Sequence, residues 1–148
     1  MRHVSVQERD FEPGAEMEAL RGAGVGAIAS FVGVVRDAGG AAVVAGMTLE
    51  HYPGMTERVL GEIVELAFVR WALVGVRLVH RVGALAPGER IVLVAVSAAH
   101  RREAFEACEF IMDRLKTEAP FWKKETTPEG ERWVEAKDSD AAAAQRWG

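Results

Sequence analysis

Cysteine is nearly absent from this 148-residue sequence, since Cys108 is the only one. One cysteine can form neither an internal disulfide nor a zinc or iron–sulfur site that needs several thiolates, and this fits a reducing compartment. The sequence also lacks an apolar run near the roughly 18 residues that a membrane-spanning helix requires. No apolar segment follows residues 1–5, so a secretory signal is not expected. These absences predict a cytoplasmic protein with no membrane partner.

An excess of positive charge is missing as well: 18 lysines and arginines stand against 22 aspartates and glutamates, for a net charge of −4. Nucleic-acid-binding domains more often carry a basic excess, so no nucleic-acid partner is expected, although a local basic pocket is compatible with this total. The hydrophobic fraction of 49% and the charged fraction of 27% are ordinary for a globular protein. No linker, charge block or internal repeat divides the chain, and residues 1–148 are expected to form one domain.

The sequence does contain hydrophobic periodicity that predicts both helices and strands. Helices are expected over residues 13–21, from an N-cap at Thr56 to about Trp71, over 101–118 and over 138–147, and strands over 26–35, 43–52, 74–82, 91–96, 121–125 and 131–136, with a loop over 38–42. The continuous apolar run over 91–96 is typical of a strand buried on both faces. Strand pairs separated by single helices favour an α+β fold over a doubly wound sheet.

Positively charged side chains stand at the ends of several predicted elements. Arg36 follows the strand over 26–35 beside a glycine-containing loop, where it could bind an anion through two hydrogen bonds or simply face solvent. His100 and Arg101 open the helix over 101–118, where main-chain N–H groups and the helix dipole favour a bound anion. A basic cap facing solvent is the alternative there.

Three lysines follow towards the C-terminus. Lys116 lies in the last turn of the predicted helix, where the helix dipole favours any lysine, so its position alone means little. In the strand that follows, Lys123 shares a face with Phe121, and Lys124 shares the other face with Trp122. A lysine that loses water beside an aromatic ring has a lowered pKa and can act as a proton donor or nucleophile. The alternative is a lysine whose ammonium group reaches solvent.

Other suggestive patterns have simpler interpretations. The glycine-rich residues 22–27 follow a helix and open a strand, the reverse of a dinucleotide-binding loop, and they are predicted to stop the helix. The four histidines show no metal-ligand spacing, and no serine lies in a nucleophile motif, so no metal site is expected. Cys108 lies on the apolar face of the helix over 101–118 and is predicted to be part of the core.

Five motifs occur in a fixed order along the chain. They are GAIASFVGVVRD at 26–37, LEHYPGM at 49–55, RVGALAPGE at 81–89, AHR at 99–101 with Ala104-Phe105 after it, and IMD, LK and APFWKKE within 111–125. Together, over about residues 24–147, they resemble the family of large, catalytic subunits of molybdopterin synthase.

This resemblance implies an α+β fold of the α/β hammerhead type, with a mixed or antiparallel sheet and additional antiparallel strands. It implies the conversion of cyclic pyranopterin monophosphate into molybdopterin, a step of molybdenum cofactor biosynthesis that installs two sulfurs as a dithiolene. The sulfur would arrive as a thiocarboxylate on the C-terminal Gly-Gly of a small ubiquitin-like carrier subunit. Two large subunits would form a central homodimer with one carrier on each outer side, which makes a heterotetramer. No metal or other cofactor is implied for this step.

The resemblance also assigns roles to individual residues. Lys116 matches a lysine essential for sulfur transfer and is expected to give acid–base or covalent assistance, whereas Lys123 matches a second pocket lysine that stabilises charge and transfers a proton. Residues expected to bind substrate are Arg36, His100, Arg101, Lys116, Lys123, Lys124, Glu125, Val34, Val35 and Lys137. Relatives often have threonine or lysine at Val34, so only main-chain contacts are expected there. Lys137 stands where a relative's arginine can reach the neighbouring subunit's phosphate site, and lysine lacks the guanidinium fork.

Two other functions compete with this one. A homologue that binds a ubiquitin-like partner without catalysis is the first, and the presence of both Lys116 and Lys123 argues against it. A nucleic-acid-binding domain is the second, and the acidic balance argues against that. The resemblance therefore predicts that the scattered basic residues converge in one pocket for an anionic pterin.

Overall fold

The computed structural model describes all of the chain except residues 37, 40–41, 44, 135–137, 146 and 148. Its strands are β1 (Arg2–Gln7), β2 (Ala27–Val34), β3 (Ala38–Gly39), β4 (Ala42–Val43), β5 (Gly46–His51), β6 (Leu73–Arg81), β7 (Gly83–Leu85), β8 (Arg90–Ala98), β9 (Phe121–Thr127) and β10 (Gly130–Val134). Its helices are α1 (Pro13–Glu18), α2 (Met55–Arg70), α3 (Arg101–Glu118) and α4 (Asp138–Gln145).

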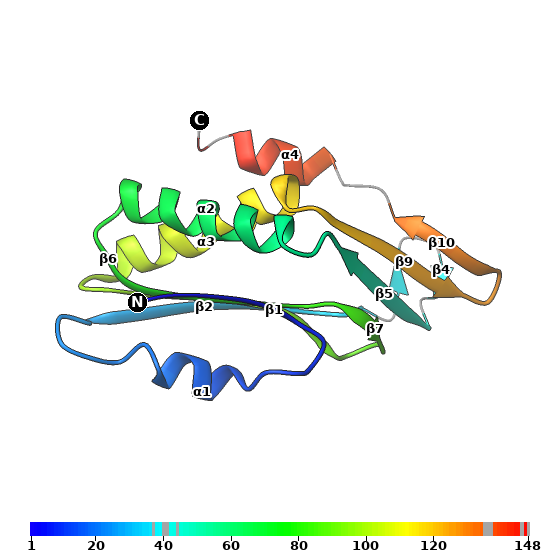
Figure 1. Cartoon of the computed structure of the whole chain (residues 1–148), viewed down its shortest axis with the longest axis horizontal. Coiled ribbons are helices and arrows are strands. Elements are labelled where there is room, and N and C mark those ends of the chain that lie inside the picture. Colours follow the sequence, from blue (N-terminus) through cyan, green and yellow to red (C-terminus); the bar gives the residue numbers. More distant parts are fainter. Residues whose placement is uncertain (37, 40–41, 44, 135–137, 146, 148) are drawn as a thin grey trace.

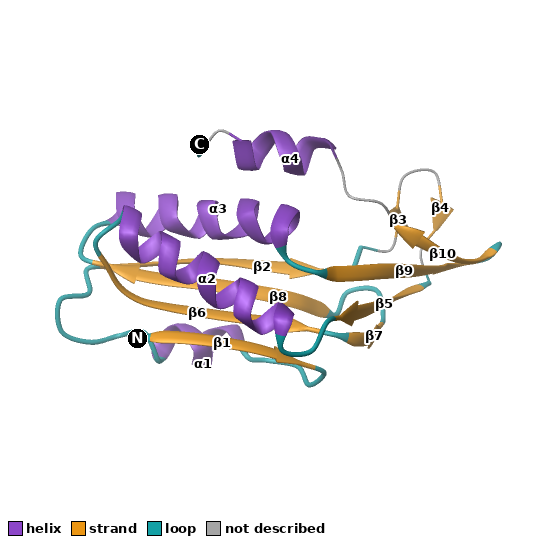
Figure 2. Ribbon diagram, turned by 45° about the horizontal axis from the view of Figure 1, so that its top comes forward, coloured by secondary structure: helices purple, strands orange, loops and turns teal. Residues whose placement is uncertain are grey.

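The longer strands form two sheets. The main sheet has the order β1-β6-β8-β2, in which β1 is parallel to β6 and the other neighbours are antiparallel. The side sheet has the order β10-β9-β5-β7 and is antiparallel throughout. Helices α2 and α3 cover one face of the main sheet and α1 the other, while the side sheet extends beyond one end (Figures 1 and 2). The predicted α+β fold, with a mixed sheet and additional antiparallel strands, is confirmed.

The main core lies between β8 and the two long helices. Strand β8 is buried from Val92 to Ala98, in agreement with the apolar run that predicted a strand buried on both faces. Leu60 and Ile63 of α2 pack in one cluster with Phe110 and Ile111 of α3 and with the side chains of β8. No helix in the described ranges is long and apolar enough to cross a membrane.

The start of α2 differs from the sequence-based expectation. The N-cap is Gly54 and not Thr56. Gly54 has a φ of 86°, a left-handed conformation that favours glycine, and its N–H donates to Oε1 of Glu57 at 3.0 Å. Thr56 lies inside the first turn and is fully buried, so its hydroxyl bonds elsewhere in the molecule.

Two other expectations are corrected by long-range or hairpin pairing. The segment over 38–42, predicted as a loop, contains β3 and the first residue of β4, and these two strands pair Ala38 with Val43 and Gly39 with Ala42. Strand β1 was not predicted at all. It pairs in parallel with β6, about seventy residues away in sequence, so this short segment becomes a strand through a partner that local patterns do not reveal.

The two sheets are joined where β6 ends. The guanidinium group of Arg81 is buried there and donates to the carbonyl of Glu8 at 2.9 and 3.1 Å and to that of Arg90 at 3.0 Å. Beside it lies a small apolar cluster whose buried members are Val35, Met47, Leu49, Val82 and Leu85. The apolar cluster joins the side sheet to the main sheet, and the candidate site is built on this junction.

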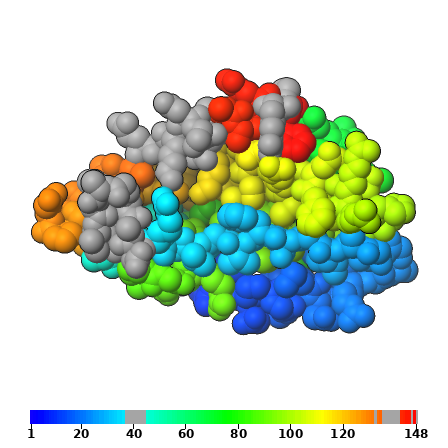
Figure 3. All heavy atoms as spheres, turned by 180° about the vertical axis from the view of Figure 1, so that it is seen from behind, coloured from blue at the N-terminus to red at the C-terminus, as the bar shows by residue number. Residues whose placement is uncertain are grey.

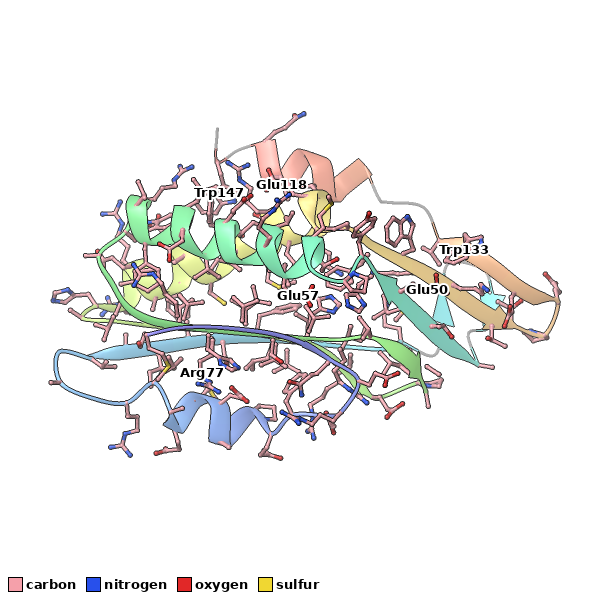
Figure 4. The ribbon with its side chains drawn as sticks, in the orientation of Figure 1. Glu50, Glu57, Arg77, Glu118, Trp133 and Trp147 are labelled. Atoms are coloured by element: carbon pink, nitrogen blue, oxygen red, sulfur yellow. The ribbon has the colours of Figure 1, made fainter. Side chains whose placement is uncertain are left out.

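The C-terminal segment packs against the outside of α3. The indole Nε1 of Trp147 donates to Oδ2 of Asp113 at 2.6 Å. Its ring meets the rings of Trp71 and Phe110 edge-on, with centroids 5.7 Å away in both cases (Trp147 is labelled in Figure 4). These contacts anchor the segment that carries α4, the helix predicted at this end of the chain.

Candidate functional site

Lys116 and Lys123 lie on either side of the junction between α3 and β9. The helix ends before Pro120, as predicted, because the residue before proline avoids the helical region, and Ala119 has the extended angles φ −73° and ψ 130°. The chain then turns directly into β9. Lys116 is exposed in the last turn of α3, and Lys123 is half-buried as the third residue of β9.

His80 shows that the two lysines lie near one point of the structure. Its side chain is 4% exposed, and its Nδ1 lies 2.8 Å from the carbonyl oxygen of Arg81. The pKa of His80 is lowered to about 3: burial is the largest cause, and the nearby Lys116, Lys123 and His51 add to it, against the raising effect of the hydrogen bond to Arg81. His80 is therefore neutral, with three cationic or titratable groups gathered around it.

His51 and His80 were not singled out by sequence reasoning. Both were tested for metal-ligand spacing, which they lack, and the sequence offers no other signal for a histidine placed beside lysines. His51 is the last residue of β5, and His80 is the next-to-last residue of β6. Their proximity arises from tertiary pairing, because His51 lies opposite Phe121 in the register of β5 with β9.

Arg36 emerges at the same end of the molecule as Lys123. The preceding residue, Val35, is 3% exposed and belongs to the apolar cluster that contains Leu49. Leu49 lies directly opposite Lys123 in the register of β5 with β9. Arg36 itself is exposed. Its guanidinium group and the two lysines thus belong to one end of the fold, and we call Arg36, Lys116 and Lys123 the lysine end.

The two valines before Arg36 differ in what they offer to a ligand. Val34 is exposed and lies opposite Arg90 beside an irregularity in the β2–β8 register. Val35 has its side chain in the core, its N–H donates to the carbonyl of Glu89 at 2.9 Å, and its carbonyl accepts from the N–H of Gly88 at 2.8 Å. Both main-chain groups of Val35 are therefore already used by the protein.

Lys124 and Glu125 point to different sides of the side sheet. Glu125 shares a face with Lys123, because alternate residues of a strand lie on the same side. Lys124 lies on the other face, where its Nζ is 3.6 Å from a carboxylate oxygen of Glu131 and 4.8 Å from the ring centroid of Trp133 (labelled in Figure 4). The structure thus separates Lys124 from Lys123. Lys137 lies outside the described residues.

His100 and Arg101 lie at the opposite end of the main sheet. Because β2 and β8 are antiparallel, Ala27 pairs with Ala98 at one end and Val34 with Arg90 at the other. The eight residues of β2 span about 26 Å, so His100 and Arg101 are separated from Arg36 by roughly that length. The prediction that all five basic residues converge is therefore wrong for a single chain.

The region around His100 and Arg101, here called the histidine end, is held by close main-chain packing. The N–H of Gly26 donates to the carbonyl of Ala98 at 2.9 Å, and a Cβ on Gly26 would lie 2.2 Å from the carbonyl oxygen of Ala99. Only glycine fits this approach. A cavity of about 430 Å³ is lined there by Gly26, Ala99, His100, Arg101 and Arg102. A basic cavity over the first turn of a long helix is suited to an anionic group such as a phosphate.

Cys108 takes no part in either end. It is buried on α3, and burial raises the pKa of its thiol to about 12, with a smaller contribution from Glu109. The prediction that Cys108 belongs to the core is confirmed. At neutral pH the thiol is protonated and shielded from solvent.

Comparison with known proteins identifies the family. The family model described as "MoaE protein" matches residues 6–118. The chain belongs to the MoaE family. A molybdopterin synthase catalytic subunit from Ralstonia nicotianae is 56% identical over 150 residues, which cover 100% of this chain and 85% of that protein. The MoaE protein of Burkholderia ambifaria has a solved structure with a TM-score of 0.86 and 55% identity, covering 100% of this chain and 99% of that one.

A more distant solved structure supports the fold alone. It is a protein–protein complex of subunits 1 and 2 of molybdopterin-converting factor from Helicobacter pylori. The TM-score is 0.71 at 21% identity, and the match covers 93% of this chain and 90% of that one. The overall fold is thus shared with that structure at low sequence identity.

Proposed function

We propose that this MoaE-family chain is the catalytic subunit of a molybdopterin synthase. It transfers sulfur from the C-terminal thiocarboxylate of a small ubiquitin-like carrier to cyclic pyranopterin monophosphate and so forms the dithiolene of molybdopterin. The observation that carries the proposal is the pair Lys116 and Lys123, gathered at His80 in a chain that is 56% identical over its full length to a molybdopterin synthase catalytic subunit.

The lysine end is chemically suited to this reaction. Both the carrier's thiocarboxylate and the phosphate of the pterin are anions, so ammonium and guanidinium groups attract them. Attack at the thiocarboxylate, or transfer of its sulfur, develops negative charge that a fixed ammonium group stabilises. Lys116, exposed at the end of α3, provides acid–base or covalent assistance, and the half-buried Lys123 stabilises charge and transfers a proton.

A complete site in this proposal requires two copies of the chain. Arg36, Lys116 and Lys123 belong to one end of β2 and His100 and Arg101 to the other, about 26 Å away. Two copies related by a two-fold axis, with their β2 strands antiparallel, bring the histidine end of one copy to the lysine end of the other. His100 and Arg101 of the second copy then bind the pterin and its phosphate beside Lys116 and Lys123 of the first.

The surface that would make this contact is the edge of the main sheet. Strand β2 is an edge strand without charged residues or proline, and an exposed edge of this kind is normally covered. Phe31 of β2 and Phe105 of α3 are exposed, at 42% and 64%. Figure 3 shows β2 and α3 adjoining on this face of the molecule. A second copy that pairs along β2 would cover both phenylalanines.

The remaining partners follow from the same proposal. One carrier docks on each outer side of the homodimer to give a heterotetramer, and its C-terminal Gly-Gly tail reaches the lysine end. The Helicobacter structure, a complex of two different subunits, is compatible with such an arrangement. Val34, Glu125 and Lys137 are the further residues proposed to contact substrate. Lys124 faces the other side of the side sheet and Val35 contributes only by holding Arg36, so neither is now proposed to touch the substrate. The proposed compartment is the cytoplasm.

The test is reconstitution with purified components. The chain is mixed with thiocarboxylated carrier and cyclic pyranopterin monophosphate, and molybdopterin is measured after conversion to a fluorescent derivative. Lys116→Ala is expected to lower the rate at least about 100-fold, the size of effect seen when one charge-stabilising group is removed. Arg58→Ala, a change at an exposed arginine of α2, is the matched control. Docking of the carrier without product from the wild-type chain would instead support a non-catalytic binding protein.

A further inference from the structure

Thr56 occupies an unusual position for a polar side chain. It is the second residue of α2, it is fully buried, and it does not cap the helix. Its hydroxyl accepts a hydrogen bond from the N–H of Tyr52 at 3.0 Å and donates one to the carbonyl of Pro120 at 3.1 Å. The hydroxyl therefore joins the end of β5, the start of α2 and the turn between α3 and β9.

The acceptor of this bond, the carbonyl of Pro120, lies between Lys116 and Lys123 along the chain. Pro120 is four residues after Lys116 and three before Lys123, and its carbonyl is 64 residues away from Thr56 in sequence. This bond is long-range, and it acts together with the pairing of Phe121 with His51 in the β5–β9 ladder. The N–H of Phe121 bonds to the nearby carbonyl of Ala119 at 2.9 Å, which is a local bond within the turn itself.

The same turn sets the position of β9 against His80. Phe121 directly follows Pro120, and its ring stacks on the His80 imidazole with the centroids 3.8 Å apart. A rotation of the Pro120 peptide would therefore disturb Phe121, the first residue of β9, where β9 begins to pair with β5. Lys116 lies on α3, and Ala119 and Phe121 beside the turn pack against the core cluster that includes α3. The Pro120 peptide is thus one of the groups that set the separation of the two ammonium groups.

We propose that Thr56 is a positioning residue of the sulfur-transfer site, which holds Lys116 and Lys123 at their working separation by fixing the Pro120 peptide. This inference rests on the function proposed above and goes beyond it, because the hydroxyl of Thr56 bonds to main-chain groups of Tyr52 and Pro120. Catalytic groups misplaced by about 1 Å can lose about 100-fold in rate even when the change is remote from the chemistry. The hydroxyl of Thr56 is the group that prevents such a displacement.

The first test compares three substitutions at Thr56 with one elsewhere. Thr56→Val keeps the volume and removes the hydroxyl, Thr56→Ser keeps the hydroxyl, and Thr56→Cys keeps a weaker donor. The control is Thr127→Val, because Thr127 is also a buried threonine whose hydroxyl donates to a main-chain carbonyl, that of Gly130 at 2.8 Å, in the β9–β10 turn. All variants are assayed at a temperature at which circular dichroism shows them to be folded.

The expected result is a fall in the catalytic rate without a matching change in KM. With saturating thiocarboxylated carrier, Thr56→Val should lower the single-turnover rate about 10- to 100-fold with little change in KM for the pterin. Thr56→Ser should retain most of the rate, Thr56→Cys should lie between, and Thr127→Val should match the wild type. A Thr56→Val enzyme as active as Thr127→Val, or a Thr56→Ser enzyme as impaired as Thr56→Val, overturns the proposal. If Thr56→Val does not fold, the Ser and Cys pair gives the same comparison.

A second readout does not depend on activity. Lysine acylation by acetic anhydride at limiting dose, followed by peptide mass spectrometry, gives the relative reactivity of Lys116 and Lys123. Thr56→Val should change this ratio by about threefold, because the two amines would no longer have the same surroundings as in the wild type. Thr127→Val should leave it unchanged, and an unchanged ratio in Thr56→Val contradicts the proposal. If the wild-type chain made no molybdopterin, the proposed function would fail while this readout still tested the role of Thr56.

Discussion

The imidazole ring of His80 stacks on the phenyl ring of Phe121, with the centroids 3.8 Å apart and the planes inclined by 17°. The contact links the end of β6 in the main sheet to the start of β9 in the side sheet. Because Phe121 lies two residues before Lys123, the same contact supports the strand that carries a proposed catalytic group. His80 thus supports the proposed site structurally, and burial and the surrounding positive charge keep it neutral.

The first prediction concerns the pH dependence of stability. Burial lowers the pKa of folded His80 to about 3, whereas the unfolded chain binds the proton near pH 6.5. Above pH 6.5 both states are neutral at this residue. As the pH falls from about 6.5 towards 3, the unfolded state takes up a proton that the folded state does not, so stability is lost by at most about 1.4 kcal/mol per pH unit.

Urea unfolding at several pH values between 7 and 4 measures this loss. The control is His80→Phe, which keeps an aromatic ring beside Phe121 and cannot titrate. The variant should lose less stability than the wild type over this range, because one fewer group binds a proton on unfolding. Equal pH slopes for the two proteins would show that His80 is not the buried neutral group described here.

The second prediction concerns the sharing of one site by two chains. Lys116→Ala and Arg101→Ala should each be inactive as homodimers. A heterodimer of the two contains one site with both residues intact and one with neither, so an equal mixture in which subunits exchange freely should recover about a quarter of wild-type activity. Recovery is measured after unfolding the variants together and refolding them. The control mixture, Lys116→Ala with Lys123→Ala, affects the same end and should recover nothing, and equal recovery in both mixtures would refute sharing.

The third prediction concerns Gly26 at the histidine end. A methyl group there would lie 2.2 Å from the carbonyl oxygen of Ala99, so Gly26→Ala should push the segment before His100 out of place. Overpacking of this kind costs about 1–3 kcal/mol in stability. The KM for the phosphorylated pterin should rise, because His100 and Arg101 move with the segment.

Gly22→Ala is the matched control, since a Cβ at Gly22 meets no atom within 4 Å. It should leave both the melting temperature and the KM near their wild-type values. A Gly26→Ala protein that behaves like Gly22→Ala in both measurements would show that the close approach of Gly26 to Ala99 does not constrain the histidine end.

The fourth prediction concerns the thiol. Cys108 is buried and burial raises its pKa to about 12, so it should not react with iodoacetamide in the native protein and should react fully in urea. Cys108→Ala should keep kcat within about twofold while losing roughly 1–2 kcal/mol of stability through the small cavity it leaves. Abolished sulfur transfer in a folded Cys108→Ala protein would mean that the transferred sulfur passes through this residue.

Sequence reasoning succeeded where the signal is local. The helix over 101–118 and the buried strand near 91–96 were predicted because apolar periodicity and Pro120 determine them within a short window. The motifs also singled out the basic residues that the proposed site uses, and their roles stay predictions. Strand β1 and the cap at Gly54 were missed because each depends on a distant partner or on a backbone angle.

The spatial grouping of the site could not be predicted from the sequence for a similar reason. Arg36 and His100 are separated by the register of two antiparallel strands, which places them at opposite ends of the sheet. Thr56 acts through a carbonyl 64 residues away. Strand register and long-range hydrogen bonds of this kind are properties of the folded chain, and they cannot be predicted from the residue types involved.

The placement of basic residues at both ends of β2 has a genetic consequence. In the proposed homodimer every chain supplies lysines to one site and the His100–Arg101 pair to the other. A chain that lacks both Lys116 and Arg101 would therefore inactivate both sites of the dimer that it forms with a wild-type chain. Such an allele should behave as dominant, in contrast to each single substitution, which leaves a wild-type partner with one working site.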